Sequence, residues 1–155
     1  MRRKLYFIIL VMPFVPLLAG CAGGGKAAVN VGEALQFDKE QVWQLVAMRG
    51  KELPVQADPV IFMLHPESGT LRGRIACNRY FADYKVTLDK VTAEGTRYTL
   101  SVMYVSGGDV QCPEGDMAVQ ERYLSLLAKV DACLLTPYTL TLYQRGKETL
   151  KYELQ

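Results

Sequence analysis

Apolar and polar residues alternate along most of the chain beyond residue 40, which is the pattern of strands that bury one face. Turn-forming Gly, Pro, Asn and Asp residues separate the alternating stretches. The pattern predicts strands over residues 41–48, 59–64, 70–76, 84–88 and 98–105, of which the last is the most β-prone. Short strands joined by tight turns indicate antiparallel pairing.

The hydrophobic period changes after residue 112. Apolar residues now recur at i, i+4, i+7, i+8 and i+11, and they are Val119, Tyr123, Leu126, Leu127 and Val130. This spacing predicts a helix over residues 117–130 with one apolar face. Pro113, Glu114 and Asp116 suit the start of a helix, because proline tolerates the first turn and acidic side chains favour the positive end of the helix dipole.

Two further alternating stretches, residues 138–143 and 149–154, flank a turn and predict a C-terminal β-hairpin. Strands, one helix and then two strands indicate an α+β fold. We therefore expect a curved antiparallel β-sheet, shaped like a half-barrel, that packs around the single helix. Residues 41–155 are enough for one core and form one predicted domain.

The first 40 residues do not follow these patterns. Three basic residues precede an apolar run over residues 5–18, and Leu18-Ala19-Gly20-Cys21 follows, which resembles a bacterial lipobox. The run is shorter than the roughly 20 residues of a spanning helix. Residues 1–20 are therefore predicted to be a signal peptide and residues 21–40 a lipidated Cys21 followed by a flexible tether. The resemblance to a lipobox implies that acyl chains, palmitate among them, would hold the protein on the membrane. It also implies that Ala22, in place of an aspartate after Cys21, would direct the protein to the outer membrane, facing the periplasm.

Removal of this signal changes the charge. Of the 18 basic residues, three precede Leu5, so the mature chain has 15 basic against 16 acidic side chains. A near-neutral domain without a basic block gives no case for nucleic acid as a partner.

Cysteines fit an oxidising compartment. With Cys21 lipidated, Cys77, Cys112 and Cys133 remain, and three thiols form only one bridge among themselves. Cys133 lies in the apolar run 130–135, where a free cysteine behaves as a small core residue. The preferred disulfide is Cys77–Cys112, which would stabilise the fold by roughly 3 to 4 kcal/mol. Whether Cys133 is free or competes for this bond stays open.

Residues that could carry chemistry are few. His65 is the single histidine and is expected to be an exposed turn residue, and Asn78 is expected to form a turn beside the bridge. The chain has no Gly-x-Ser-x-Gly elbow, Cys-x-x-Cys pair or phosphate-binding glycine loop. We predict no catalytic residue, metal or cofactor. A redox thiol at Cys77 or Cys112 stays an alternative, because Cys112 precedes a helix N-terminus.

Aromatic residues offer a candidate partner surface at Tyr80, Tyr84 and Tyr104, although tyrosines on strand faces more often pack in the core. The loop over residues 106–109 offers a second candidate, as the plug of an inhibitor-type module like small lipoproteins that block lysozyme. Its Asp109 has the wrong sign for catalytic carboxylates.

Several motifs together resemble one family. They are Trp43-Gln44-Leu45, the run from Gly73 to Tyr80 followed by Tyr84, Cys112, a helix with Glu121, Tyr123 and Leu127, and Leu140-Thr141-Leu142. They resemble the META domain of HslJ-like envelope lipoproteins over about residues 40 to 155, with Ala76 and Ala82 where that family commonly has glycine. The resemblance implies a small α+β domain with a bent antiparallel sheet, placement in the bacterial envelope and an association with stress.

The sequence thus predicts a non-enzymatic lipoprotein, tethered to the outer membrane, that binds or supports an envelope protein partner under stress. The lysozyme-inhibitor-like module and the thiol enzyme are the alternatives.

Overall fold

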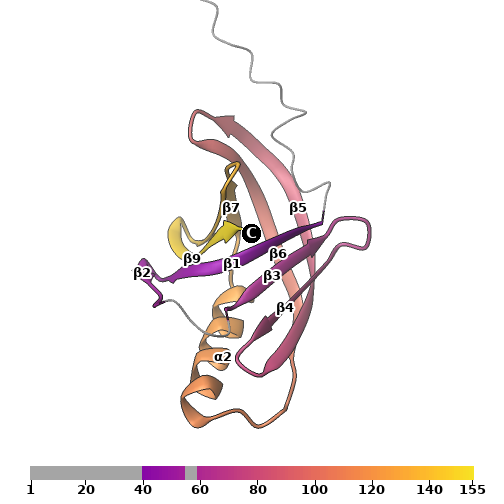
Figure 1. The fold of residues 1–155 in the computed structure, drawn as a ribbon. Coiled ribbons are helices and arrows are strands. Elements are labelled where there is room, and N and C mark those ends of the chain that lie inside the picture. The colour runs from indigo at the N-terminus through magenta and orange to yellow at the C-terminus, as the bar shows by residue number, and fades with distance from the viewer. Residues whose placement is uncertain (1–39, 55–58) are drawn as a thin grey trace, which may run out of the picture.

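The structure is a computed structural model that describes residues 40–54 and 59–155. Its sheet is antiparallel throughout, and one helix interrupts the strand order between β6 and β7 (Figure 1). The elements are β1 (Gln41–Met48), β2 (Lys51–Glu52), β3 (Ile61–His65), β4 (Thr70–Ile75), β5 (Asn78–Thr92), β6 (Gly95–Gly107), α2 (Glu114–Leu127), β7 (Ala132–Leu135), β8 (Thr139–Gln144) and β9 (Lys147–Leu154).

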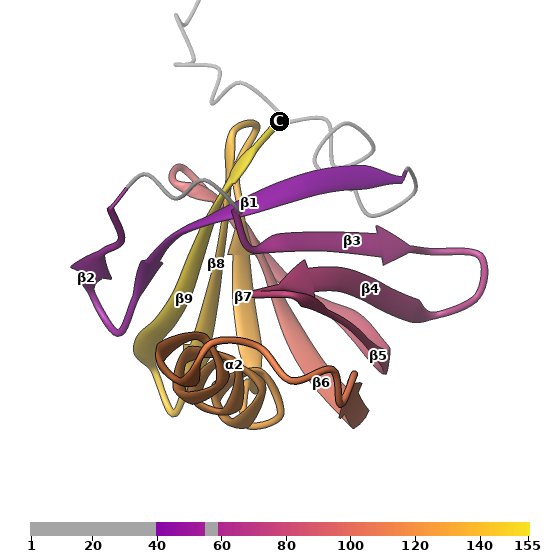
Figure 2. The same ribbon diagram turned by 60° about the horizontal axis from the view of Figure 1, so that its bottom comes forward.

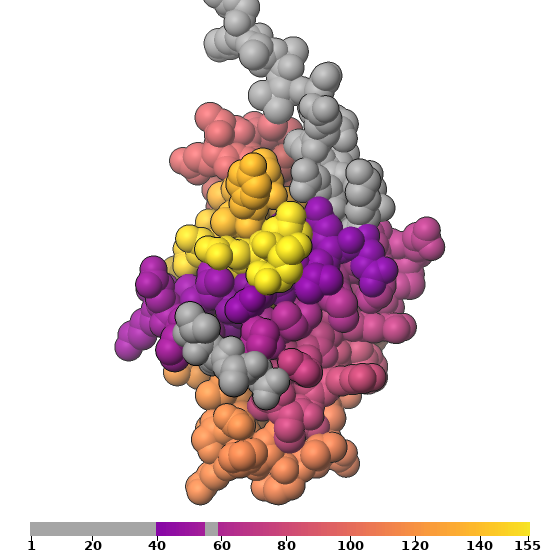
Figure 3. Space-filling model, viewed as in Figure 1, coloured from indigo at the N-terminus to yellow at the C-terminus, as the bar shows by residue number. Residues whose placement is uncertain are grey.

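The sheet closes into a barrel of eight strands. Each strand from β3 to β9 pairs with the next, and β1 pairs with β3 along one edge and with β9 along the other. Figure 3 shows the C-terminal segment lying directly against β1 on the surface. The expected half-barrel is therefore wrong in this respect, since pairing from Trp43↔Leu154 to Met48↔Leu150 completes the circle. Closure removes the exposed edges that an open sheet would have.

Helix α2 covers one end of this barrel and is not wrapped by the sheet (Figure 2). It begins after Pro113 and ends at Leu127, three residues earlier at each end than the apolar spacing predicts. The buried side chains on its inner face include Tyr123, Leu126 and Leu127. Val130 is also buried, but it lies in the connection to β7 and not in the helix.

The core lies inside the barrel and under the helix. Its buried residues in the described part of the chain fall between Trp43 and Tyr152. Strand β7 was not among the predicted strands, because its four residues follow the helix closely and read only as an apolar run. Its inward-facing Cys133 is fully buried and free, in agreement with the expected small core residue.

The bounds of two long strands, β5 and β6, differ most from the predicted bounds. β5 starts at Asn78, six residues before the predicted strand, and β6 extends to Gly107. The β5–β6 ladder changes register between Phe81 and Asp83, and Tyr104 adopts a φ of 54° on the facing strand. Such a bulge bends a strand, which helps a barrel to curve. Within the described residues, no helix is long and apolar enough to cross a bilayer.

Candidate functional site

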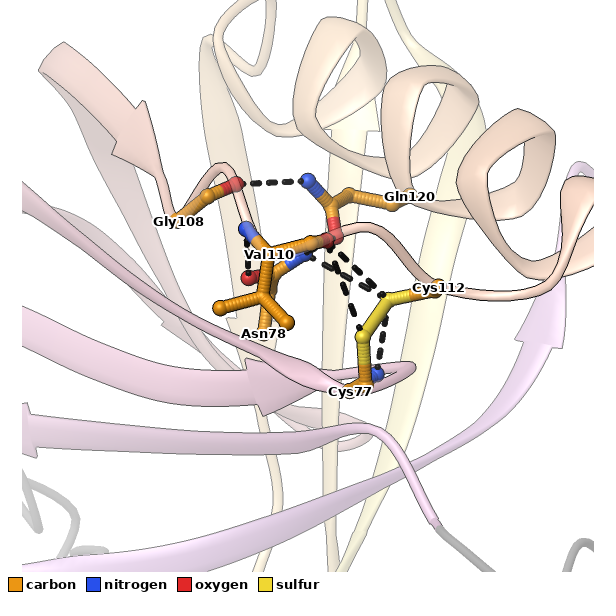
Figure 4. The surroundings of a disulfide bond; sticks show 6 residues. All are labelled: Cys77, Asn78, Gly108, Val110, Cys112 and Gln120. Carbon is orange, nitrogen blue, oxygen red and sulfur yellow. Dashed lines mark hydrogen bonds between the residues drawn. A yellow bond between two sulfur atoms is a disulfide. The ribbon is translucent and has the colours of Figure 1, made fainter.

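A disulfide joins the turn after β4 to the loop that leads into α2 (Figure 4). Cys77 and Cys112 have Cα atoms 5.7 Å apart, so the predicted bond is present. Cys77 is exposed, whereas Cys112 is 4 % exposed and accepts a hydrogen bond from the Cys77 backbone N–H at 3.2 Å. Neither thiol is therefore free in this structure to act as a redox group.

Asn78 is the centre of a polar cluster beside this bond. Its side-chain Nδ2 donates to the Val110 carbonyl at 2.8 Å and to Gln120 Oε1 at 2.9 Å, and its Oδ1 accepts from the Val110 N–H at 3.1 Å. Gln120 Nε2 donates in turn to the Gly108 carbonyl at 3.2 Å. The interpretation of Asn78 as a turn former is wrong, because it is 2 % exposed and starts β5.

This cluster fixes the loop between β6 and α2 at its two ends. The Gly108 N–H donates to the Arg79 carbonyl at 2.8 Å. Gly108 itself has to be small, because a Cβ there would lie 2.5 Å from Asn78 Oδ1. The loop is thus held in one conformation by hydrogen bonds that leave the polar groups of Asn78 and Gln120 engaged with protein atoms.

Three buried tyrosines form a second polar cluster, between the helix and the barrel. The Tyr123 hydroxyl lies 2.6 Å from that of Tyr80 and 2.9 Å from that of Tyr152, and Tyr80 donates to the Ile61 carbonyl at 2.9 Å. Because each hydroxyl has one proton, the chain of donation runs from Tyr152 through Tyr123 to Tyr80. Burial is the main cause that raises the pKa of all three phenols well above the usual value.

Of the three tyrosines predicted to form a partner surface, two are buried and one is exposed. Tyr80 and Tyr84 are 2 % and 6 % exposed, so they belong to the core and cannot form a partner surface. Their strand positions face the barrel interior, where aromatic rings contribute the largest apolar area. Tyr104 alone is exposed, at 80 %, because it lies in the bulge of β6.

His65 is at the end of β3 and not in an exposed turn. Its side chain is 25 % exposed and its Nδ1 lies 3.7 Å from Glu40 Oε1. The residues that the structure describes contain no group of three His, Cys, Asp or Glu side chains placed to hold a metal ion. Residues 1–39, with Cys21, lie outside the described part of the chain.

The outer face of β3, β4 and β5 carries a shallow groove of about 680 Å³. Its polar lining comes mainly from Arg72, Arg74 and Arg79, which are all exposed. Phe81 lines it too and is 59 % exposed. Gly73 and Tyr80 lie beneath, and Gly73 has to be glycine because a Cβ would collide with the Ile61 carbonyl and the Tyr80 ring.

The sequence does contain a signal for this groove, although the candidate surface of three tyrosines did not include it. Arg72 and Arg74 are two positions apart, as are Arg79 and Phe81, and a two-residue turn separates the two strands. Residues two apart share one face of a strand. Four such residues on a hairpin thus predict one charged and aromatic surface.

Comparison with solved structures finds proteins of similar fold. Of the solved structures, an NMR structure of a protein from Burkholderia xenovorans is similar with a TM-score of 0.59 and 21 % identity, over 95 % of this chain and 99 % of that one. Another NMR structure matches with a TM-score of 0.50 and 21 % identity, over 74 % and 88 % of the two chains. These likenesses show a shared fold.

No curated protein matches the chain. A family model described as META domain matches residues 33–155, which includes the disulfide, the asparagine cluster and the groove. The chain therefore belongs to the META domain family.

Proposed function

We propose that this META domain is a non-enzymatic binding module, held at the periplasmic face of the outer membrane by acyl chains on Cys21. The observation that supports binding is the groove on β3, β4 and β5, where three arginines and Phe81 project from paired strands. Side chains on a hydrogen-bonded sheet lose little freedom when they contact a partner, which lowers the entropic cost of association.

The polar side chains near the disulfide support a structural role for that region. Asn78 and Gln120 are 2 % and 5 % exposed and hydrogen-bond to each other and to the loop backbone. The three buried tyrosines likewise bond to one another. Groups that are enclosed and engaged in this way stabilise a fold, and they leave the exposed groove as the better candidate for a functional surface.

The anchor is supported by the sequence before the domain, where a basic start and an apolar run precede Cys21. Metabolic labelling with a fatty acid tests it in bacteria that express the full chain. We expect the wild type to incorporate label and to sediment with outer membranes, and Cys21→Ala to do neither. Cys133→Ala is the matched control and keeps both properties. Label that persists in Cys21→Ala would disprove the anchor.

Binding is tested by affinity capture of the lipidated protein from its native envelope. We expect an envelope component that is retained by the wild type and lost by the double variant Arg72→Gln/Arg79→Gln. Equal retention by both proteins would show that the groove is not the binding site. Growth of the producing strain under heat or antibiotic stress, with and without these substitutions, then tests the proposed stress-related role.

One observation keeps the inhibitor-type module as a second candidate. Residues 106 and 107 of the predicted loop belong to the end of β6, so the loop before α2 starts at Gly108. The disulfide and Asn78 fix this loop, and it displays Val110 at 60 % exposure. Inhibitory loops gain affinity from such preorganisation. A lysozyme activity assay with Val110→Ser as the comparison decides this, since inhibition by the wild type that the variant lacks would favour it.

A further inference from the structure

The groove combines positive charge and apolar surface in neighbouring rows. Strand register places Ile61 opposite Arg74 and Arg74 opposite Arg79 in one row. In the next row Met63 lies opposite Arg72, and Arg72 opposite Phe81. Since adjacent strands are about 4.8 Å apart, each apolar residue has an arginine as its neighbour on the same face. A ligand that covers this face meets both kinds of group at once.

The charge on this face is positive. Arg72, Arg74 and Arg79 line the groove, and the lining residues in the described part of the chain include no Asp or Glu. Among residues 40–54 and 59–155, acidic side chains at the edge of this face are Asp83, which is opposite Thr70, and Glu40, which lies 3.7 Å from His65. Guanidinium groups bind phosphate oxygens through paired hydrogen bonds, so the face suits phosphate-bearing anions.

Exposed apolar side chains lie in the groove and on the neighbouring strand β1. Phe81 is 59 % exposed, and Val42 on β1, which is paired with Met63, is 37 % exposed. A small soluble anion would leave these side chains in water. At a membrane surface, an aromatic side chain enters the boundary between headgroups and acyl chains while arginines reach the phosphates.

The first described residues of the chain lie at one end of this groove. Gln41 starts β1 opposite Leu64, and Glu40 lies 3.7 Å from His65 at the edge of the groove. The described chain therefore enters the domain beside His65, at one end of the groove. Even fully extended, residues 22–39 reach only about 60 Å at about 3.4 Å per residue, so an anchored domain stays within reach of the bilayer.

We infer that the outer face of β3, β4 and β5 docks on anionic phospholipid headgroups of the membrane to which the chain is tethered. The arginines bind the headgroup phosphates, and the Phe81 ring inserts between the lipid headgroups. This inference rests on the proposed binding role and names its partner as a lipid surface, with the acidic face of a protein as the competing outcome.

Vesicle sedimentation tests it with residues 22–155, which contain the whole described core and lack the acyl anchor. Vesicles contain one part phosphatidylglycerol to two parts phosphatidylcholine, or phosphatidylcholine alone. We expect binding to the anionic vesicles only. Each basic residue near an anionic surface strengthens binding about fivefold, so Arg72→Gln/Arg79→Gln weakens the partition coefficient by about 30-fold. Phe81→Ala weakens it as well.

The matched control removes two charges elsewhere. Lys90→Gln/Arg122→Gln changes exposed residues outside the groove and leaves binding near the wild-type value. Raising NaCl from about 0.1 to about 1 M shortens the screening length from about 10 to about 3 Å and releases the protein. Circular dichroism and thermal melts show that each variant is folded before it is compared.

The outcomes separate this inference from the function on which it rests. Absence of binding to anionic vesicles, or equal loss in the groove and control variants, overturns the lipid inference. Groove-dependent capture of a protein without vesicle binding also overturns it, yet leaves the binding module in place. Loss of acyl labelling affects only the anchor, because the vesicle assay does not use it.

Discussion

At the scale of single residues, Asn78 and Ala76 decide how the hairpin of β4 and β5 meets the rest of the molecule. Asn78 is buried and bonds to the loop before α2, while Ala76 is in the turn with a φ of 51°. This left-handed conformation costs a residue with a Cβ roughly 1 to 2 kcal/mol. A glycine at this position would avoid that cost, because it has no Cβ.

Replacement of Asn78 by alanine should destabilise the domain by about 2 to 4 kcal/mol. Gln120 Oε1 and the backbone of Val110 would lose their partner, and buried polar groups without hydrogen bonds carry the full cost of desolvation. Urea unfolding measures the change. Gln111→Ala, at an exposed position of the same loop, is the control and should change stability by less than about 0.5 kcal/mol. A loss below about 1 kcal/mol for Asn78→Ala would contradict this account.

Two alanine-to-glycine substitutions should act in opposite directions. Ala76→Gly removes the strain of a positive φ and should raise stability by up to about 1 kcal/mol. Ala82 is a buried strand residue, so Ala82→Gly should lower stability by about 1 kcal/mol through lost packing and greater chain entropy. Thermal unfolding of both variants compares them. A lower melting temperature for Ala76→Gly would refute the strain argument.

At the scale of elements, the disulfide joins a hairpin turn to the start of the helix, which are separated by 35 positions. The Asn78 cluster holds the same loop without a covalent bond. Because α2 follows this loop directly, both contacts restrain the start of the helix over the barrel end. The disulfide and the hydrogen bonds of Asn78 therefore hold the same loop before α2.

Reduction of the Cys77–Cys112 bond should lower the free energy of unfolding by about 4 kcal/mol, as loop-closure entropy gives for this separation. Urea unfolding of residues 22–155 with and without reductant measures it, and Cys77→Ser/Cys112→Ser should reproduce the reduced value. Thiol titration of the denatured, oxidised chain should find one free thiol, that of Cys133. Two or more free thiols would show that the bond does not form.

At the scale of the whole molecule, closure of the barrel and the buried tyrosines determine stability. Eight paired strands leave β1 and β9 with a neighbour on each side. Helix α2 then covers one end and encloses three phenol hydroxyls. Both the paired edges and the enclosed hydroxyls require the closed barrel.

Hydrogen exchange should show β1 and β9 to be as protected as β4. In an open half-barrel these two would be edge strands, and their amides would exchange through local opening. Because each pairs with the other here, we expect their slowest amides to exchange only with global unfolding. Amide exchange followed by NMR tests this. Exchange within minutes along β1 and β9, with protection in β4, would favour the open sheet.

Stability should fall steeply in alkali. Burial raises the pKa of Tyr80, Tyr123 and Tyr152 well above the usual value, and it raises the pKa of Cys133 from 9.0 to about 12. The folded chain thus holds these protons more tightly than the unfolded chain does. Their contribution to stability is full below the unfolded pKa values, about 9 for the thiol and about 10 for the phenols, and declines as pH rises above them.

The three tyrosines together give a slope of up to about 4 kcal/mol per pH unit well above pH 10, at about 1.4 kcal/mol for each group. Urea unfolding between pH 8 and 11 measures it, and tyrosinate absorbance should appear together with loss of structure. Tyr123→Phe removes one titrating group and should reduce the slope by about a third. A stability independent of pH up to 11 would contradict burial of these hydroxyls.

Local patterns in the sequence were enough for the secondary structure of most of the domain, since side-chain alternation and helical spacing depend only on near neighbours. They predicted the strands of β1, β3, β4, β8 and β9, the helix with its acidic start, and the buried Cys133. The Cys77–Cys112 bond was inferred from the number of cysteines and the apolar setting of Cys133, not from a local pattern. Lipidation at Cys21 stays a prediction, because residues 1–39 lie outside the described chain.

Tertiary structure alone decided the rest. Closure depends on pairing β1 with β9, which lie about a hundred residues apart and carry no local signal of one another. Contacts between distant parts of the chain also placed Tyr80 and Tyr84 inside the barrel, where the sequence had suggested a partner surface. They placed Asn78 against Gln120, where the sequence had suggested a turn. The groove exists because strand register aligns Arg72 with Phe81 and Arg74 with Arg79. Alternation fixed which residues share a face, and only the folded barrel determined whether that face met the core or water.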